Sequence, residues 1–479
     1  MEFEAVIGLE VHAQLTTSSK AFCGSSAEFG KGVNELCDPV TLGLPGALPV
    51  PNRRMVDFAI MLGLATHCEI KRYNRFARKH YFYPDLPKGY QISQYEEPIC
   101  ERGYVTVRMA NGVRNIGITR IHMEEDAGKN IHDSRSNSSL VDLNRAGVPL
   151  LEIVSQPDLR TPEEASSYLK VLRQMLRYLD ICDGNMEEGS MRCDANVSVR
   201  PVGETKFGTR AEVKNINSFK FVEKALEYEI ARQIAVIKGG GKVVQETRLF
   251  DSANNTTHTL RTKESSADYR YFPDPDLPPL DIQDSWIEDV RSKMPILPEA
   301  AREKLMSNYG LSDYDASILT SERKFMDYFM AAFDVCGNPK GACNWISSEL
   351  FGFLNKEGLV LEQSKVKAVD LGALVKLIDT EVISGKMAKT VFEEMCQSGK
   401  SPNLIVEEKG LKQVTDPEAI RSIANKAIDA SGSQLAEYLG GNERLFGFFV
   451  GQAMKLSGGN LNPKVANQVI KEELDKRKK

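Results

Sequence analysis

The segment Leu9-Glu10-Val11-His12-Ala13-Gln14-Leu15 places apolar residues at odd positions and polar residues at even positions. This alternation predicts a β-strand with one buried face. Glu10 and His12 then share the polar face, about 6–7 Å apart at the rise of a strand. A carboxylate and an imidazole at this separation could bind one divalent cation or share an acid–base task. Taken alone, the pair fits a solvent-exposed sheet face somewhat better than a metal-binding or acid–base site.

A second polar segment, IHMEEDAGK at residues 121–129, follows a run at 116–119 that is β-branched apart from Gly117. The run predicts a strand, and Gly128 offers the turn that would end it. Because adjacent strand residues face opposite ways, Glu124 and Glu125 cannot point at one ligand, but they could serve two cations on opposite sides of the backbone. An acidic turn exposed to solvent is the alternative interpretation.

Two later segments, 191–200 and 210–214, also alternate between apolar and polar residues. Their polar faces include Asp194, Asn196, Glu212 and Lys214. A single sheet that gathered these side chains with Glu10 and His12 would form an anionic cavity in need of cations. Mg²⁺ with a nucleotide suits such a cavity, because Mg²⁺ prefers a few carboxylates together with phosphate oxygens.

Residues 75–90, with the sequence RFARKHYFYPDLPKGY, interleave basic and aromatic side chains. This mixture is typical of surfaces that contact phosphates and stack on bases or on an adenine ring. The alternative is a strand edge and turn with ordinary aromatic packing.

The order of the predicted elements indicates an α+β fold. Short strands dominate the first part, with helices predicted after the cap Thr161 and over 218–237. The prolines between 273 and 279 exclude a helix there. After about residue 293 only helices joined by short loops are predicted. We therefore expect a cradle-like mixed sheet-and-helix domain at 1–292, a helical domain at 293–402 and a helical tail domain at 403–479.

Composition narrows the class of protein. The chain has 479 residues and a net charge of -5, so nucleic acid would have to bind local basic patches. There is no run of 18 apolar residues and no signal peptide, so we expect no membrane association and a cytoplasmic location. The nine cysteines are expected to be reduced thiols. Cys23 and Cys37 predict no zinc site, because Ser25 and Val40 stand where further cysteine ligands would be.

Common catalytic motifs are missing from the sequence. It contains no G-x-x-x-x-G-K-[ST] phosphate-binding loop, and the glycines at 239–241 follow a predicted helix instead of opening one. It contains no G-x-S-x-G and no cysteine in a known glutamine-hydrolysing context. A phosphate-binding loop, a serine hydrolase elbow and a cysteine glutaminase are therefore not expected.

The sequence resembles the B subunits of bacterial aspartyl/glutamyl-tRNA amidotransferases. The resemblance is carried by long segments and extends over the full length of the chain, at residues 6–15, 80–94, 118–129, 141–157, 186–200, 211–219 and 268–280. A related archaeal family shares this core, but it has a large additional domain for which the chain has no room.

The resemblance implies a cradle-like kinase domain that uses ATP and Mg²⁺. This domain would phosphorylate the side-chain carboxylate of Glu on tRNA(Gln), or of Asp on tRNA(Asn). A glutaminase A subunit would send ammonia through a channel to displace the phosphate, and a small C subunit would complete a heterotrimer. The helical domain and tail would contact tRNA.

The family's site residues can be placed on this sequence. The resemblance implies catalytic and metal-binding roles for Glu10, His12 and Glu125, which are all present. Further acidic positions suited to metal fall on Glu124 and Glu212. Positions suited to binding nucleotide or phosphate fall on Asp194, Asn196, Lys214 and Arg200. A position suited to the ammonia channel falls on Lys79.

Two other classes of function remain open from the residues alone. One is an ATP-dependent ligase that acts on a free amino acid or peptide. The other is a tRNA-binding scaffold without catalytic activity. Dependence of ATP cleavage on aminoacyl-tRNA would exclude the first, and loss of that cleavage on substitution of Glu10 or His12 would exclude the second.

Overall fold

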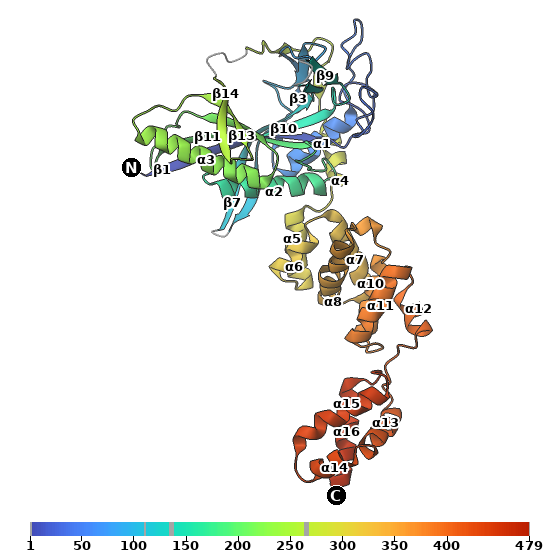
Figure 1. Ribbon diagram of the computed structural model, residues 1–479. Helices are drawn as coiled ribbons and strands as arrows, with labels where there is room; N and C mark the ends of the chain where they lie inside the picture. Colours follow the sequence, from blue (N-terminus) through green and yellow to red (C-terminus); the bar gives the residue numbers. More distant parts are fainter. Residues whose placement is uncertain (1, 110–111, 134–137, 263–267, 479) are drawn as a thin grey trace. The chain divides into compact units, whose positions relative to one another are not determined.

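The computed structural model describes residues 2–109, 112–133, 138–262 and 268–478. The chain forms two compact units, residues 1–298 and residues 299–479 (Figure 1). The first unit contains the strands, and the second is helical. The predicted α+β class, with a mixed sheet followed by helices, is confirmed.

A twelve-stranded sheet forms the frame of the first unit as far as the structure describes it. Its main path runs in the order β14-β13-β12-β11-β1-β10-β7-β5-β4-β15, and off this path β6 pairs with β7 and β2 pairs with β6. Only the β12–β13 pair is parallel among the pairings of the described strands. The strands are β1 (Phe3–Gln14), β2 (Glu69–Ile70), β4 (Ala77–His80), β5 (Tyr90–Ser93), β6 (Cys100–Met109), β7 (Gly112–Glu125), β10 (Pro149–Ser155), β11 (Met191–Pro201), β12 (Ala211–Ile216), β13 (Glu246–Asp251), β14 (Thr256–Thr262) and β15 (Phe272–Pro273).

The first unit also contains two small sheets beside the twelve-stranded sheet. One pairs β3 (Tyr73–Asn74) with β16 (Leu280–Asp281), and the other pairs β8 (Lys129–Asp133) with β9 (Ser138–Asp142).

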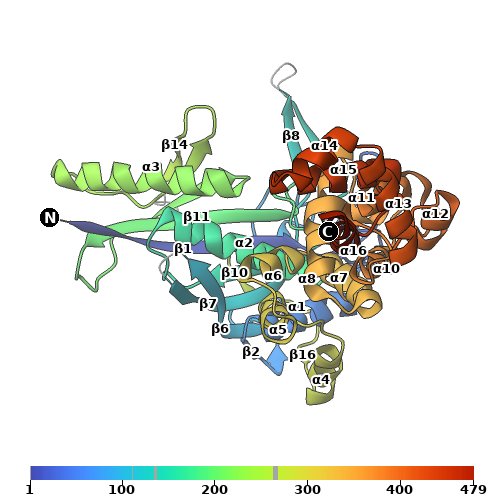
Figure 2. The same ribbon diagram turned by 90° about the horizontal axis from the view of Figure 1, so that it is seen from below.

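The alternation of apolar and polar residues along β1 decides which face of the sheet is packed against the hydrophobic core. Ile7, Leu9, Val11 and Ala13 are buried in the hydrophobic core of the first unit. The same core contains side chains of α1 (Arg53–Ala65), α2 (Pro162–Tyr178) and α3 (Phe219–Lys238), and α2 and α3 lie along the sheet in Figure 2. The even-numbered residues of β1 point the other way, because successive strand residues alternate between faces. This leaves one face of the sheet for polar side chains.

The helices of the first unit begin where the sequence indicates. Thr161 accepts a hydrogen bond from the backbone N–H of Glu164 at 3.2 Å, and Pro162 follows at the first helical position of α2. Ser218 accepts from the N–H of Phe221 and begins α3, which ends at Gly239. A capping oxygen satisfies a backbone donor that the first turn leaves unpaired. The unit also contains α4 (Asp284–Ser292).

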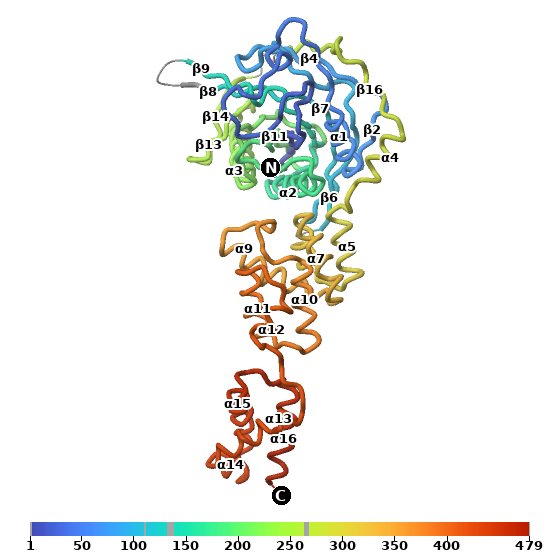
Figure 3. Tube along the Cα trace, turned by 90° about the vertical axis from the view of Figure 1, so that its right-hand side faces the viewer, coloured from blue at the N-terminus to red at the C-terminus, as the bar shows by residue number. Residues whose placement is uncertain are grey.

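The second unit contains helices grouped around two hydrophobic clusters, one within residues 301–406 and one within 420–474 (Figure 3). The helices are α5 (Pro298–Tyr309), α6 (Asp313–Leu319), α7 (Arg323–Cys336), α8 (Pro339–Asn344), the π-helix η2 (Trp345–Leu350), α9 (Phe351–Glu357), η3 (Leu361–Gln363), α10 (Ala368–Asp379), α11 (Gly385–Ser398), α12 (Pro402–Glu408), α13 (Pro417–Asp429), α14 (Gly432–Leu439), η4 (Glu443–Leu445), α15 (Phe446–Leu456) and α16 (Pro463–Lys478). The three domain boundaries drawn from the sequence stay a prediction. Among the described residues, none of the helices combines the length and hydropathy that crossing a membrane requires.

Candidate functional site

Neighbouring strands place polar side chains in rows across the face of the sheet that points away from the hydrophobic core, which we call the open face. His12 is paired with Glu152 on β10 and with Arg192 on β11, and Glu152 is paired in turn with His122 on β7. Two residues earlier on β1, Glu10 is paired with Asp194. Because directly paired residues share a face, each row converges on one side of the sheet.

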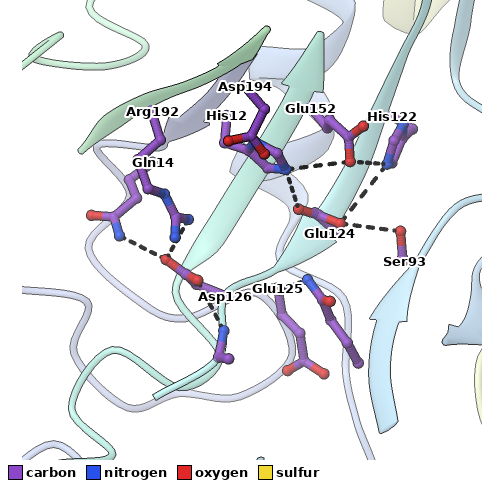
Figure 4. A network of polar contacts seen from close by, with 12 residues as sticks. His12, Gln14, Ser93, His122, Glu124, Glu125, Asp126, Glu152, Arg192 and Asp194 are labelled. Atoms are coloured by element: carbon purple, nitrogen blue, oxygen red, sulfur yellow. Dashed lines mark hydrogen bonds and ion pairs between the residues drawn. The ribbon is translucent and has the colours of Figure 1, made fainter. Parts of the chain in front are cut away.

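The first cluster contains two imidazoles and two carboxylates. His12 Nε2 lies 3.6 Å from Glu124 Oε1 and 3.4 Å from Glu152 Oε2. His122 Nε2 lies 3.8 Å from Glu124 Oε2 and 3.2 Å from Glu152 Oε2. Figure 4 shows the two carboxylates between the two rings. Ligand atoms of His12, Glu124 and Glu152 lie within 4.8 Å of one another, close enough to bind one cation.

The second cluster contains oxygen donors only. Carboxylate oxygens of Glu10, Asp194 and Glu212 also lie within 4.8 Å of one another. Lys214 Nζ donates to Asp194 and lies 3.0 Å from Glu212 Oε1. Asn196 Nδ2 donates to Glu10 Oε1 at 2.9 Å. Three carboxylates therefore face one lysine and one amide.

The pKa values show that the open face carries excess negative charge. Burial and then the carboxylates of Glu152, Glu212 and Asp194 raise the pKa of Glu10, and Lys214 offsets this only partly. Burial alone would lower the pKa of His122, but Glu152 and Glu124 raise it to about 9. A cation bound at the second cluster would relieve the repulsion around Glu10.

Glu125 lies apart from both clusters. It is buried and follows Glu124 on β7, but its side chain leaves the opposite side of the strand (Figure 4). Its Oε1 accepts from Lys88 Nζ, and from the backbone N–H of Ile92 at 2.9 Å. The structure therefore does not gather the three residues Glu10, His12 and Glu125 around one point.

The remaining predicted residues are divided between the site and its surroundings. Lys79 lines two adjoining cavities with His12, Asp194 and Lys214. Arg200 donates to Glu4 Oε1 at 2.7 Å and is not among the residues that line these cavities. A phosphate would therefore have to compete with the Glu4 carboxylate for the guanidinium of Arg200.

Three cavities follow the even-numbered side of β1. A cavity of about 350 Å³ lies over Glu10 and His12, and one of about 380 Å³ adjoins it over His12 and Glu124. A third, of about 250 Å³, is lined by apolar and polar groups at the N-terminal end of β1, among them Val6, Gly8, Pro157, Phe207 and Arg210, and it reaches Glu10 and Asn196. An apolar cavity therefore borders the second cluster.

Several residues that the sequence interpretation left without a role belong to this face. His122 and Glu152 complete the first cluster, and Asp126 Oδ2 accepts from Gln14 Nε2 and Arg192 Nη2, both at 2.8 Å. Glu152 is a single carboxylate within the apolar run of β10, and this isolation was the signal that could have identified it.

Comparison with known proteins places the chain in a family. The family model described as "GatB/GatE catalytic domain" matches residues 5–288, more than half of the chain. The chain belongs to this family. A second model, described as "GatB domain", matches residues 327–474.

Curated relatives match this chain over nearly its whole length. Proteins named as the B subunit of aspartyl/glutamyl-tRNA(Asn/Gln) amidotransferase match from Trichlorobacter lovleyi at 55% identity and from Geobacter sulfurreducens at 55%, each over 99% of this chain and 100% of the relative. The relative from Thermodesulfovibrio yellowstonii is 53% identical over 98% of this chain and 99% of its own. The resemblance drawn from the sequence is confirmed.

Proposed function

We propose that the chain activates the side-chain carboxylate of Glu-tRNA(Gln) or Asp-tRNA(Asn) with ATP and Mg²⁺. Ammonia from a glutaminase partner then converts the activated group into the amide of Gln-tRNA(Gln) or Asn-tRNA(Asn). The observation that carries this proposal is the pair of acidic clusters on consecutive polar positions of β1, beside an apolar cavity. The names of the relatives support the same activity.

In this proposal the nucleotide binds along β1. The cavity lined by Val6, Gly8 and Phe207 offers apolar contacts for a base. Its neighbour over Glu10 offers carboxylates for a magnesium-bound triphosphate and the ammonium of Lys214 for a phosphate oxygen. Base pocket and phosphate site therefore follow one another in the order that ATP requires.

The ligand atoms of the second cluster suit Mg²⁺, the cation that accompanies ATP. Glu10, Asp194 and Glu212 provide only carboxylate oxygens, which Mg²⁺ prefers. Burial first, and then the neighbouring carboxylates, raise the pKa of Glu10, and a dication would favour its ionised form. Bound there, Mg²⁺ supplies charge neutralisation between the triphosphate and an incoming carboxylate.

The first cluster is placed to orient the acyl group. An oxygen of the substrate's side-chain carboxylate attacks the γ-phosphorus, the bond to ADP breaks, and an acyl phosphate forms. Ammonia then attacks the acyl carbon, inorganic phosphate leaves with the electron pair of the broken bond, and the nitrogen gives its extra proton to the departing phosphate. Hydroxide is a poor leaving group, which is why activation must precede amidation. His12 and Glu124 border the cavity where this exchange would occur.

Ammonia would enter this cavity past Lys79 and Glu125. Lys79 borders both cavities over His12, and Glu125 is bound to Lys88 on the far side of β7. We propose Lys79 as a residue of the channel. Glu125 lines neither cavity, so the proposal that it meets ammonia at the acyl phosphate requires its side chain to leave Lys88.

The activity requires partners that the chain itself does not supply. We propose a heterotrimer with an amidase-type A subunit that releases ammonia from glutamine, together with a small C subunit. The helical unit, including the tail domain at 403–479, would contact tRNA. The cytoplasm, where aminoacyl-tRNAs are made, is the compartment that this function implies.

The decisive experiment measures ATP cleavage by the chain co-expressed with a glutaminase and its small partner. Glutamine is present, and Glu-tRNA(Gln), Asp-tRNA(Asn) or neither is added. Cleavage that requires misacylated tRNA, with amide appearing on that tRNA, is the expected result and identifies the substrate. Cleavage without tRNA would indicate a ligase for free amino acids.

Two variants connect this activity to the proposed site. Glu10→Gln and His12→Ala are expected to abolish ATP cleavage while tRNA remains bound. Glu101→Gln is the control, because Glu101 lies on β6 and lines none of the three cavities. Unchanged cleavage in both site variants would support the scaffold alternative instead.

A further inference from the structure

Five tyrosines form a continuous row along one wall of the two larger cavities. Successive ring centroids lie 6.0 Å apart from Tyr83 to Tyr81, 6.2 Å from Tyr81 to Tyr269, 6.1 Å from Tyr269 to Tyr271 and 4.1 Å from Tyr271 to Tyr95. We call these residues the tyrosine row. Tyr81, Tyr95, Tyr269 and Tyr271 are lining residues of the two cavities.

The row is assembled from segments that are distant in sequence. Tyr81 follows β4, Tyr95 follows β5, and Tyr269 precedes β15, three strands that are neighbours at the edge of the sheet. The backbone N–H of His80 donates to the carbonyl oxygen of Tyr269 at 2.9 Å and fixes two of these segments together. The row therefore belongs to the folded sheet edge.

Its two end rings remain available to a ligand. Tyr83 is 59% exposed and Tyr95 is 51% exposed, although the Tyr95 ring is stacked on Tyr271 with an interplanar angle of 7°. A ring that is already parallel to its neighbour presents its free face for a further stacked ring. Burial in the core does not explain rings that are half open to solvent.

Cations accompany the rings. Lys79, Arg120 and Arg261 line the cavity over Glu10, and none of their side chains forms an ion pair or hydrogen bond with a residue in the described part of the chain. Lys79 Nζ lies 5.1 Å from the Tyr269 ring centroid. Aromatic rings interleaved with unpaired cations are the surface that single-stranded nucleic acid recognises, by stacking of bases and attraction of phosphates.

We propose that the tyrosine row holds the single-stranded 3′ end of the aminoacyl-tRNA, with its bases stacked on the rings and its phosphates beside Lys79, Arg120 and Arg261. This inference rests on the proposed function and assigns residues to its RNA substrate. A row of five rings is longer than one base can cover, whereas the base of ATP has its own cavity beside Gly8. The row begins in solvent at Tyr83 and borders the two cavities that contain the clusters, where the acyl group must arrive.

The test measures the dissociation constant of the full chain, in complex with its partner subunits, for tRNA(Gln) with and without its single-stranded 3′ end. In Tyr95→Leu/Tyr271→Leu we expect binding of the intact tRNA to weaken by about 10- to 100-fold, since one stacked base contributes the equivalent of about 1–3 kcal/mol. The variant should no longer distinguish intact from shortened tRNA. Tyr95→Phe should retain wild-type affinity, because stacking does not need the hydroxyl.

Matched controls separate stacking from general damage. Tyr73→Leu removes a ring of similar exposure, 53%, outside these cavities and should leave tRNA affinity unchanged. Tyr95 and Tyr271 also line the cavity over Glu10, so the dissociation constant for ATP is measured in each variant and should change far less than that for tRNA. Arg120→Gln, which leaves the row intact, should weaken tRNA binding and reduce its salt dependence.

The outcomes separate the two proposals. Wild-type affinity for intact tRNA in the double variant overturns the stacking proposal, as does a wild-type protein that binds both tRNAs equally. A wild-type complex that prefers intact tRNA but forms no amide retains the stacking proposal and refutes the proposed function. Loss of ATP binding in the double variant would mean that the rings hold the nucleotide instead.

Discussion

At the scale of single residues, the direction in which a side chain leaves its strand decides its role. Glu124 and Glu125 are neighbours in sequence, yet Glu124 faces His12 while Glu125 is bound by Lys88 and the N–H of Ile92. Alternation along β7 separates them onto opposite faces. Two adjacent carboxylates therefore have different partners and different chemistry.

Glu125→Gln tests the role of the far-side carboxylate. Glutamine keeps the shape and can still accept from Ile92, but Lys88 loses its charged partner. We expect amide formation to fall by at least about 100-fold, the size of a typical proton-transfer contribution, while tRNA binding survives. Glu101→Gln, on β6, is the control. Full amide formation in Glu125→Gln would disprove the assigned role.

A second residue-scale prediction concerns stability and pH. Glu229 on α3 is fully buried, and it accepts from Arg232, Gln233 and Thr257. Burial acts to raise its pKa, but these hydrogen bonds and the charge of Arg232 hold it below the ordinary 4.5. The folded state therefore gains stability from the ionised group above about pH 4.5, and loses it as the pH falls through the lowered pKa.

Replacement of this carboxylate should be costly. Glu229→Gln removes one of the two carboxylates that Arg232 and Arg248 contact and leaves Glu246, so we expect the free energy of unfolding to fall by about 1–3 kcal/mol at neutral pH. The deficit relative to wild type should shrink in acid. Urea titration at several pH values checks this, with Glu227→Gln, an exposed position of the same helix, as control. A deficit independent of pH would contradict the explanation.

At the scale of elements, the close contact of α10 with α7 depends on a glycine. A Cβ added at Gly372 would lie 2.3 Å from the carbonyl oxygen of Ala332 and 2.9 Å from Val335 Cβ. Alanine ordinarily favours a helix over glycine, but here the backbone of the neighbouring helix occupies the space. Tertiary contact thus reverses the local preference.

Gly372→Ala is expected to lower the free energy of unfolding by about 1–3 kcal/mol through overpacking. Gly352→Ala, in α9, is the matched control, because no atom of the described chain lies within 4 Å of the added Cβ. This variant should be stabilised by about 0.5–1 kcal/mol. Thermal denaturation measures both, and changes of the same sign in the two variants would refute the packing argument.

At the scale of the whole molecule, the two compact units have separate hydrophobic clusters. Each unit should therefore unfold as its own transition. All residues proposed to bind ATP lie within residues 1–298. Ligand that binds only the folded state stabilises only the unit that contains its site.

Calorimetry of the full chain should therefore show the unfolding of residues 1–298 separately from that of residues 299–479, and magnesium–ATP should raise only the transition of residues 1–298. At 100 times the dissociation constant the stabilisation should be about 2.7 kcal/mol. Residues 299–479 expressed alone should reproduce the transition that does not respond. A single transition, or an equal response of both, would show that the units unfold together.

The sequence by itself determined the elements and the polar face. The alternation at 9–15 is local, because covalent geometry turns successive strand residues to opposite sides, and it correctly placed Glu10 and His12 on one face. Capping residues and prolines likewise determined where α2 and α3 begin. Similar long segments identified the family before any contact was known.

Only the tertiary structure decided how the polar residues are grouped. Strand order is not local, so the sequence could not show that His12 has Glu152 and Glu124 as partners, whereas Glu10 has Asp194 and Glu212. The sheet pairs β1 with β10 on one side and β11 on the other. Two residues that share a face are thereby divided between two polar clusters, because the groups that neighbour each residue come from strands far away in the chain.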